Sequence, residues 1–101
     1  MKKYDFISIT KANDNKHKYI VILFNRETGR TKQVKFGAFG MTDFTLGATL
    51  EQRNAYLLRH RKNENWSADG VATSGFWSAH LLWGESRDLQ TQLNMILKHF
   101  F

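Results

Sequence analysis

The chain of 101 residues contains no cysteine and no proline. The absence of cysteine excludes disulfide bonds and thiolate metal sites. Without proline, turns must be built by residues that tolerate unusual backbone angles, chiefly Gly, Asn and Asp. The longest apolar run, residues 19–24, is far shorter than a membrane-spanning helix, and the basic N-terminus lacks the apolar stretch of a signal peptide. We therefore expect no membrane partner.

What the chain does contain is enough apolar surface for one modest core. Hydrophobic residues make up 42% of it, including eight Phe, three Trp and three Tyr. No repeat, low-complexity stretch or linker divides the sequence. We predict a single domain over residues 1–101.

Charge is unevenly distributed along the chain, whose net charge is +6. Residues 1–36 carry nine Lys or Arg against three Asp or Glu, whereas residues 63–101 carry two against four. A basic half joined to a mildly acidic half indicates a face that meets an anionic partner. The alternative interpretation is that a pI near 9.8 simply keeps a small protein soluble.

Three segments have the patterns of β-strands. Residues 4–11 alternate apolar and polar side chains, and residues 31–36 do the same with Val34 and Phe36 inward. Residues 18–24 are apolar on both faces, which is typical of a central strand covered by helices. These segments predict an antiparallel β-meander over residues 3–37.

Three glycines follow or separate these strands. Gly29 lies in the second hairpin loop, and Gly37 and Gly40 lie where the last strand ends; we expect positive φ at such positions. Residues 37–40 lack the lysine and the helix start of a phosphate-binding loop. They are interpreted as a bend where the chain leaves the sheet.

The helical part is predicted over residues 49–100. Thr49 and Gln52 have the spacing of a capping box and open a helix to about residue 62, with Leu50, Leu57 and Leu58 on one side.

A second, nearly all-apolar helix is predicted from residue 73 or 74 to Gly84, a natural C-terminal cap. A third follows Ser86, with Asp88 in its first turn and Lys98 and His99 in its last, as the helix dipole favours. The predicted fold class is α+β: a three-stranded antiparallel β-meander followed by three helices packed on it.

No arrangement of residues indicates catalysis, a metal or a cofactor. The sequence lacks a nucleophile elbow, a phosphate loop and a dinucleotide fingerprint, and Asp43 and Glu51 would pair only by chance. The histidines lack the paired spacing of metal ligands, and His80 is interpreted as a packed helix residue. We predict a non-enzymatic protein. The four histidines are His17, His60, His80 and His99.

Basic residues interleaved with aromatic ones give a stronger signal. Arg53, Tyr56 and His60 lie three and seven residues apart and share one helix face. Guanidinium and ammonium groups bind phosphates, and aromatic rings stack on exposed bases. Cations also stabilise helix C-termini, and Trp66 can equally belong to the core. The predicted nucleic-acid-binding residues are Lys32, Lys35, Arg53, Tyr56, Arg59, His60, Arg61, Lys62 and Trp66, with Arg26 and Arg30 at the hairpin tip.

Several motifs in order carry a family resemblance. They are residues 34–38, Gly40, and residues 43–45, 59–66 and 75–83. With them the chain resembles a family of small uncharacterised proteins encoded mainly by large double-stranded DNA viruses of algae and amoebae, and by some phages. The resemblance implies a viral or phage protein located in the host cytoplasm or the virion, but implies no activity.

Two functions are therefore expected as alternatives. One is a small DNA- or RNA-binding protein that acts on a viral genome. The other is a structural virion component, such as a minor capsid or cement protein. Its basic face would contact an acidic protein surface, and Phe76, Trp77 and Trp83 would contact virion proteins or a second copy of the chain. Phosphate binding weakens steeply with salt, whereas apolar protein contacts do so far less.

Overall fold

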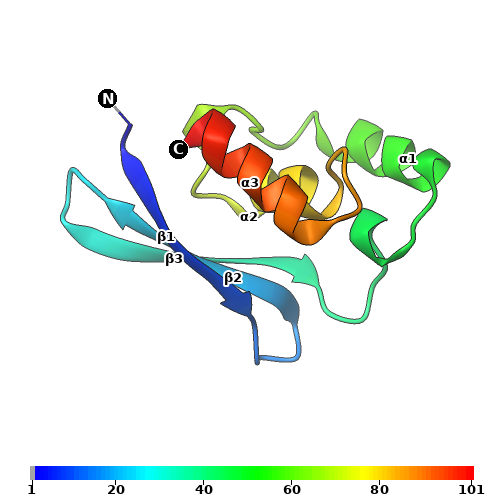
Figure 1. Ribbon diagram of the computed structural model, residues 1–101, viewed down its shortest axis with the longest axis horizontal. Coiled ribbons are helices and arrows are strands. Elements are labelled where there is room, and N and C mark those ends of the chain that lie inside the picture. The colour runs from blue at the N-terminus through cyan, green and yellow to red at the C-terminus, as the bar shows by residue number, and fades with distance from the viewer. Residues whose placement is uncertain (1) are drawn as a thin grey trace.

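A computed structural model describes residues 2–101. Strands β1 (Tyr4–Lys11), β2 (His17–Asn25) and β3 (Arg30–Ala38) form one antiparallel sheet in the order β1-β2-β3. Figure 1 shows this sheet on one side of the molecule and the helices on the other. The predicted meander is confirmed, with β2 in the centre.

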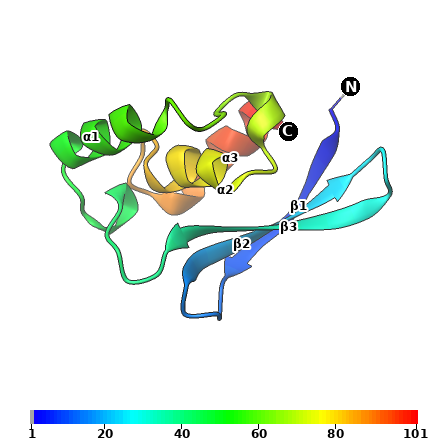
Figure 2. The ribbon, with the colours of Figure 1, turned by 180° about the vertical axis from the view of Figure 1, so that it is seen from behind.

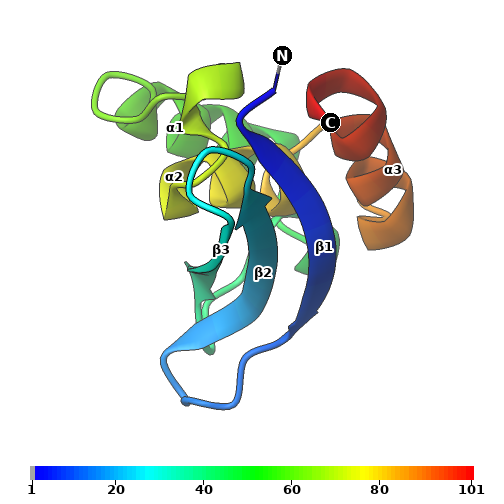
Figure 3. The same cartoon turned by 90° about the vertical axis from the view of Figure 1, so that its left-hand side faces the viewer.

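The helices cover one face of the sheet only. In Figure 3 the sheet faces the viewer, and the helices lie behind it and to one side. Val21 and Leu23 of β2 are fully buried on the helix side, as the pattern of a central strand predicts. Their neighbours Ile20 and Ile22 alternate to the other face.

The predicted bend after β3 depends on glycines with positive φ. Gly29, Gly37 and Gly40 have φ of 72°, 76° and 82°, which confirms the expectation for all three. Position 37 also has no room for a side chain, because a Cβ on Gly37 would lie 2.7 Å from Leu82 Cδ1. The chain therefore leaves the sheet at a point packed directly against the helix layer.

Three regular helices follow. They are α1 (Leu50–His60), α2 (Ser74–Trp77) and α3 (Leu89–Phe100), with short 3₁₀ turns η1 (Phe44–Leu46) and η2 (Ala68–Gly70) between the earlier elements. The predicted capping box forms, because Thr49 and Gln52 make both of its bonds. Asp88, expected in the first turn of the third helix, is instead its N-cap and accepts from Thr91 N. None of the helices within residues 2–101 has the length and apolarity needed to cross a membrane.

The second predicted helix differs from the expectation in its final turns. After α2 the chain widens into a π-helical turn, η3 (Ser78–Leu82), closed by a bond from Trp83 N to Ser78 O. Gly84 is not a left-handed cap, since its φ is not positive. A Cβ at Gly84 would lie 2.3 Å from Gln92 Nε2, so this glycine allows close approach of α3.

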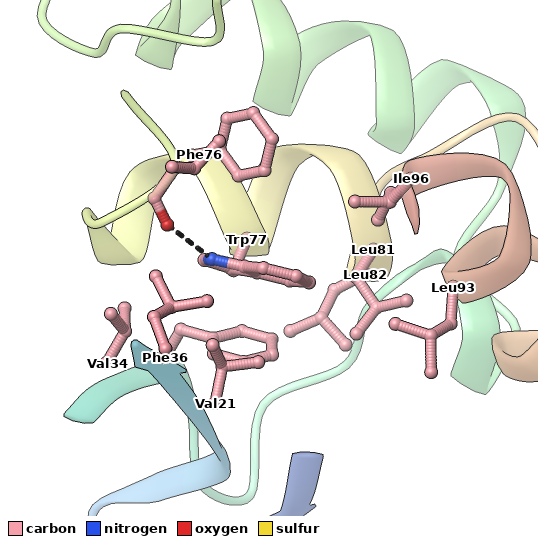
Figure 4. Close-up of a cluster of buried hydrophobic side chains, with 11 residues drawn as sticks. Val21, Val34, Phe36, Phe76, Trp77, Leu81, Leu82, Leu93 and Ile96 are labelled. Atoms are coloured by element: carbon pink, nitrogen blue, oxygen red, sulfur yellow. Dashed lines mark hydrogen bonds between the residues drawn. The ribbon is translucent and has the colours of Figure 1, made fainter. Parts of the chain in front are cut away.

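Trp77 lies at the centre of the core. Its ring lies 6.0 Å from that of Phe36 and 5.6 Å from that of Phe76, and its Nε1 donates to Val71 O at 2.7 Å. Figure 4 shows side chains of β2 and β3 on one side of this helix and Leu93 and Ile96 of α3 on another. Because the helix that carries Trp77 packs against the sheet on one side and against α3 on another, its side chains must be apolar nearly all round.

Helix α1 lies at one end of the molecule, away from the β2–β3 hairpin (Figures 1 and 2). None of its residues is fully buried. Of the leucines that share one side in the sequence pattern, Leu50 and Leu58 are 63% and 59% exposed. A different side of α1 therefore faces the protein.

Candidate nucleic-acid interface

The face of α1 predicted to bind nucleic acid is the face that packs on the protein. Arg53 is half-buried, and its Nε donates to Trp83 O at 3.1 Å and Gly84 O at 2.9 Å. Its guanidinium carbon also lies 5.6 Å from the centre of the Phe44 ring. Arg53 therefore anchors α1 to the turn after η3 through its Nε and is half-buried, rather than exposed as expected.

Tyr56 is the second anchor. Its ring stacks on His60 with centroids 4.0 Å apart and on Trp83 with centroids 4.5 Å apart. Burial and the nearby Glu64 carboxylate raise the pKa of Tyr56 to about 12. The phenol is therefore neutral at physiological pH, and its ring faces are occupied by protein rather than offered to a base.

The carboxylate of Glu64 binds two more of the predicted residues. It accepts from His60 Nδ1 at 3.0 Å and from Trp66 Nε1 at 2.9 Å. The Trp66 carbonyl accepts from His80 Nε2 at 2.8 Å, and burial lowers the pKa of His80. His60 and Trp66 thus belong to a fold-stabilising network, and His80 is the packed residue that the sequence predicts.

The two sheet lysines do not join α1. Lys32 lies on the same face of β3 as the inward-facing Val34, whereas Lys35 points to the opposite face. Lys35 Nζ lies 3.6 Å from Asp14 Oδ2. The His17 ring and backbone amides also bond to Asp14, which holds the pKa of its carboxyl well below the usual range.

The hairpin cations also lie apart from α1. Lys32 is near the start of β3, at the end of the sheet opposite α1 (Figure 1). Arg26 makes a two-bond pair with Asp5, with Nη2 to Oδ1 at 2.6 Å and Nε to Oδ2 at 3.0 Å. The expected continuous basic face from the sheet to α1 is therefore not formed.

Three predicted residues remain available to a partner. Arg59, Arg61 and Lys62 are exposed, and none of them forms an ion pair within residues 2–101. They surround the C-terminal end of α1. We refer to Arg59, Arg61 and Lys62 as the basic end of α1.

A groove of about 580 Å³ lies beside the basic end of α1, between this helix and residues 37–42. Arg59 and His60 line one wall, and Lys18 and Ser78 lie among the other lining residues. Lys18 was not singled out by the sequence patterns. Its position beside α1 results from the close approach of β2 and the helix layer at Gly37.

Lys18 forms a buried ion pair with Asp43, whose side chain is 2% exposed. The Lys18 Nζ lies 2.5 Å from Asp43 Oδ2, and Asp43 also accepts from Thr45 N and Leu46 N as the cap of η1. The spacing of Asp43 and Thr45 is the sequence signal for this cap. The pair fastens the segment between β3 and α1 to β2.

Among residues 2–101, no three histidine, aspartate or glutamate side chains are grouped so that they could hold a metal ion.

Comparison with known proteins identifies a family. Residues 7–60, more than half of the chain, match a family of unknown function, DUF5754. No curated protein and no solved structure matches the chain. The matched residues span the sheet and α1 but end before Arg61, so they do not include the later motifs of the expected resemblance. The chain therefore belongs to DUF5754, a family of unknown function.

Proposed function

We propose that the protein is a non-enzymatic nucleic-acid-binding protein that contacts phosphates through the basic end of α1. One observation carries this proposal: Arg59, Arg61 and Lys62 are exposed and have no carboxylate partner within residues 2–101. Guanidinium and ammonium groups in that state are available to phosphate oxygens.

Two further features support the same function. The net charge of +6 attracts a polyanion before contact. The groove beside Arg59 is wide enough, at about 580 Å³, for part of a nucleotide. The aromatic rings of α1 are excluded from this contact because they stack on one another, so binding depends on phosphates and shows little sequence preference.

The test is a comparison of two charge reversals with equal net charge. Arg59→Glu combined with Lys62→Glu removes cations from the basic end of α1. Arg30→Glu combined with Lys32→Glu removes as many from the distant hairpin, where both residues are exposed. We expect the α1 variant to lose at least about tenfold in affinity for a labelled mixed-sequence oligonucleotide by fluorescence anisotropy. The hairpin variant should stay much closer to the wild type.

The affinities of both variants are then measured at several salt concentrations. Each lost phosphate contact lowers the slope of log affinity against log salt by about 0.7 for single strands and 0.9 for duplexes. The α1 variant should therefore have a slope shallower by about one to two units. Equal affinities and slopes for the two charge reversals would contradict the proposed site, since net charge alone would then explain binding.

A second candidate function is a protein contact, including the virion role that the family resemblance implies. The interface expected at Phe76 and Trp77 is not on the surface, because both side chains are fully buried, and Trp83 is covered by Tyr56. Large apolar side chains are exposed elsewhere. They are Phe39, Met41, Leu46, Leu50 and Leu58, each between 59% and 66% exposed.

Phe39, Met41 and Leu46 line one groove of about 470 Å³. Exposed apolar side chains grouped in this way favour burial of the groove by a protein partner or by a second copy of this chain. Sedimentation of the wild type and of a Met41→Glu, Leu46→Glu variant tests self-association. A monomeric wild type would exclude the second-copy form of this candidate. Mass spectrometry of purified virus particles would test the virion form.

A further inference from the structure

A further cavity, of about 710 Å³, lies between α1, η3 and α3. Its volume falls in the range of small-molecule binding sites. Arg53 and Leu57 of α1 line it, whereas Arg59 and His60 line the neighbouring groove of about 580 Å³. The cavity is therefore separate from the proposed nucleic-acid site, although Trp83 borders both.

The walls of the cavity are mostly apolar and come from distant parts of the chain. Leu57 comes from α1, Trp66 from the loop after it, and Ile96 and Phe100 from α3. Trp66 and Trp83 are the two tryptophans that are not fully buried. Since side chains from three elements converge without filling the space, a flat or extended apolar group can replace water there.

Some polar groups of the lining are already used by the fold. Gln92 Oε1 accepts from Ser86 N at 3.0 Å, and His80 Nε2 donates to the Trp66 carbonyl at 2.8 Å. Arg53 uses its Nε for the Trp83 and Gly84 carbonyls. These bonds use polar groups of the lining that a nucleobase would otherwise bind.

The remaining charged groups are mainly cationic. They are the terminal nitrogens of Arg53 and the ammonium of Lys98, against the single carboxylate of Glu85. Lys98, His99 and Glu85 form no ion pair within residues 2–101. An apolar pocket with a net cationic rim selects a ligand that is apolar at one end and anionic at the other.

We infer that this cavity binds a small amphipathic carboxylate, whose aliphatic or aromatic body lies against Trp66, Trp83 and Ile96 and whose carboxylate meets a cation of the rim, Arg53 or Lys98. A matching amine would place its charge among cations, and a nucleotide would leave the polar edge of its base unpaired. This inference does not depend on the proposed nucleic-acid function.

The experiment titrates the purified protein with decanoate, decylamine and adenosine monophosphate, each below its aggregation concentration. Tryptophan fluorescence reports on the cavity because Trp66 and Trp83 line it, and calorimetry gives the stoichiometry. We expect saturable binding of one decanoate per chain, with decylamine and adenosine monophosphate at least about tenfold weaker. No saturable decanoate binding, or equal binding of either competitor, would overturn the inference.

Variants at Met95 locate the site. Met95 lines the cavity, is 43% exposed and so tolerates a charge. Met95→Glu should weaken decanoate binding by about tenfold, and Met95→Lys should strengthen it. Leu58→Glu is the control, since Leu58 is exposed on α1 and does not line the cavity. If both Met95 variants bind decanoate like the Leu58 variant, the ligand binds elsewhere and the inference is wrong.

Discussion

At the scale of single residues, Gly37 combines two constraints that are separate elsewhere in the chain. It shares positive φ with Gly40, but of these two glycines only Gly37 has other side chains within contact of an added Cβ, Leu82 at 2.7 Å and Lys18 at 3.1 Å. A Cβ at Gly40 would meet nothing within 4 Å. The two positions therefore allow backbone strain to be measured apart from steric overlap.

We predict that Gly40→Ala lowers the free energy of unfolding by about 1 kcal/mol, the cost of left-handed backbone for alanine. Gly37→Ala should cost about 1–3 kcal/mol more, because Leu82 must also move. Urea denaturation of the two variants and the wild type measures the cost of backbone strain and the cost of steric overlap. Equal losses in the free energy of unfolding would show that Leu82 and Lys18 move aside at no cost in free energy.

The Lys18–Asp43 pair is the other residue-scale feature on which the fold depends. We predict that Asp43→Ala destabilises the protein by about 3–5 kcal/mol, because it leaves the nearly buried Lys18 ammonium unpaired and removes the cap of η1. Lys18→Met combined with Asp43→Ala should be less destabilised than the sum of the single variants, since neither charge then remains. Additive losses in urea denaturation would mean that the two side chains do not interact.

At the scale of elements, α1 differs from the rest of the fold. Its two ends are set locally, by the capping box of Thr49 and Gln52 and by the cations of its last turn. Its attachment to the protein depends on Arg53 and Tyr56 rather than on buried leucines. Strands β2 and β3, α2 with η3, and α3 all contain buried side chains, whereas α1 has none.

We predict that the amides of α1 exchange with solvent faster than those of β2 and α3, because local opening of α1 exposes little apolar surface. Arg53→Met should lower the free energy of that opening by about 1.5–3 kcal/mol, the range for hydrogen bonds from a charged donor. Hydrogen exchange followed by mass spectrometry measures this loss.

Arg59→Met is the matched control for α1, because Arg59 is an exposed cation of the same helix without a side-chain partner within residues 2–101. It should leave the exchange of α1 amides unchanged. Equal acceleration by both variants would show that helix propensity, and not the bonds to the Trp83 and Gly84 carbonyls, holds α1 in place.

At the scale of the whole molecule, the core consists of the sheet, α2 with η3, and α3, and His80 faces the cavity next to it. Burial lowers the pKa of His80 below its ordinary value of 6.5. The unfolded chain therefore binds a proton at His80 as pH falls below about 6.5, while the folded chain does so only at lower pH. The folded state is therefore less stable in the pH interval between the pKa of His80 in the folded chain and that in the unfolded chain.

We predict that the wild type loses more stability than a His80→Gln variant between pH 7.5 and pH 5, since the variant lacks this titration. Thermal unfolding at several pH values measures the difference, and titrations common to both proteins cancel in it. A constant difference between the two proteins over this interval would contradict the prediction.

The sequence by itself determined the features that depend on local patterns. Alternation and β-branched residues predicted the meander and the central position of β2, and the capping-box spacing predicted where α1 begins. Periodicity also predicted correctly that Arg53, Tyr56 and His60 share a face of α1. These features follow from residues within one element, whose spacing is set by backbone geometry.

Only the tertiary structure decided what those faces meet. Periodicity defines a face but does not say whether solvent or protein lies against it, so the stripe of Arg53 and Tyr56 was predicted to bind nucleic acid and instead packs on Trp83. The same holds for the pairing of Lys18 with Asp43 across 25 positions. Such contacts depend on distances through space that the folded chain sets and that local spacing does not contain.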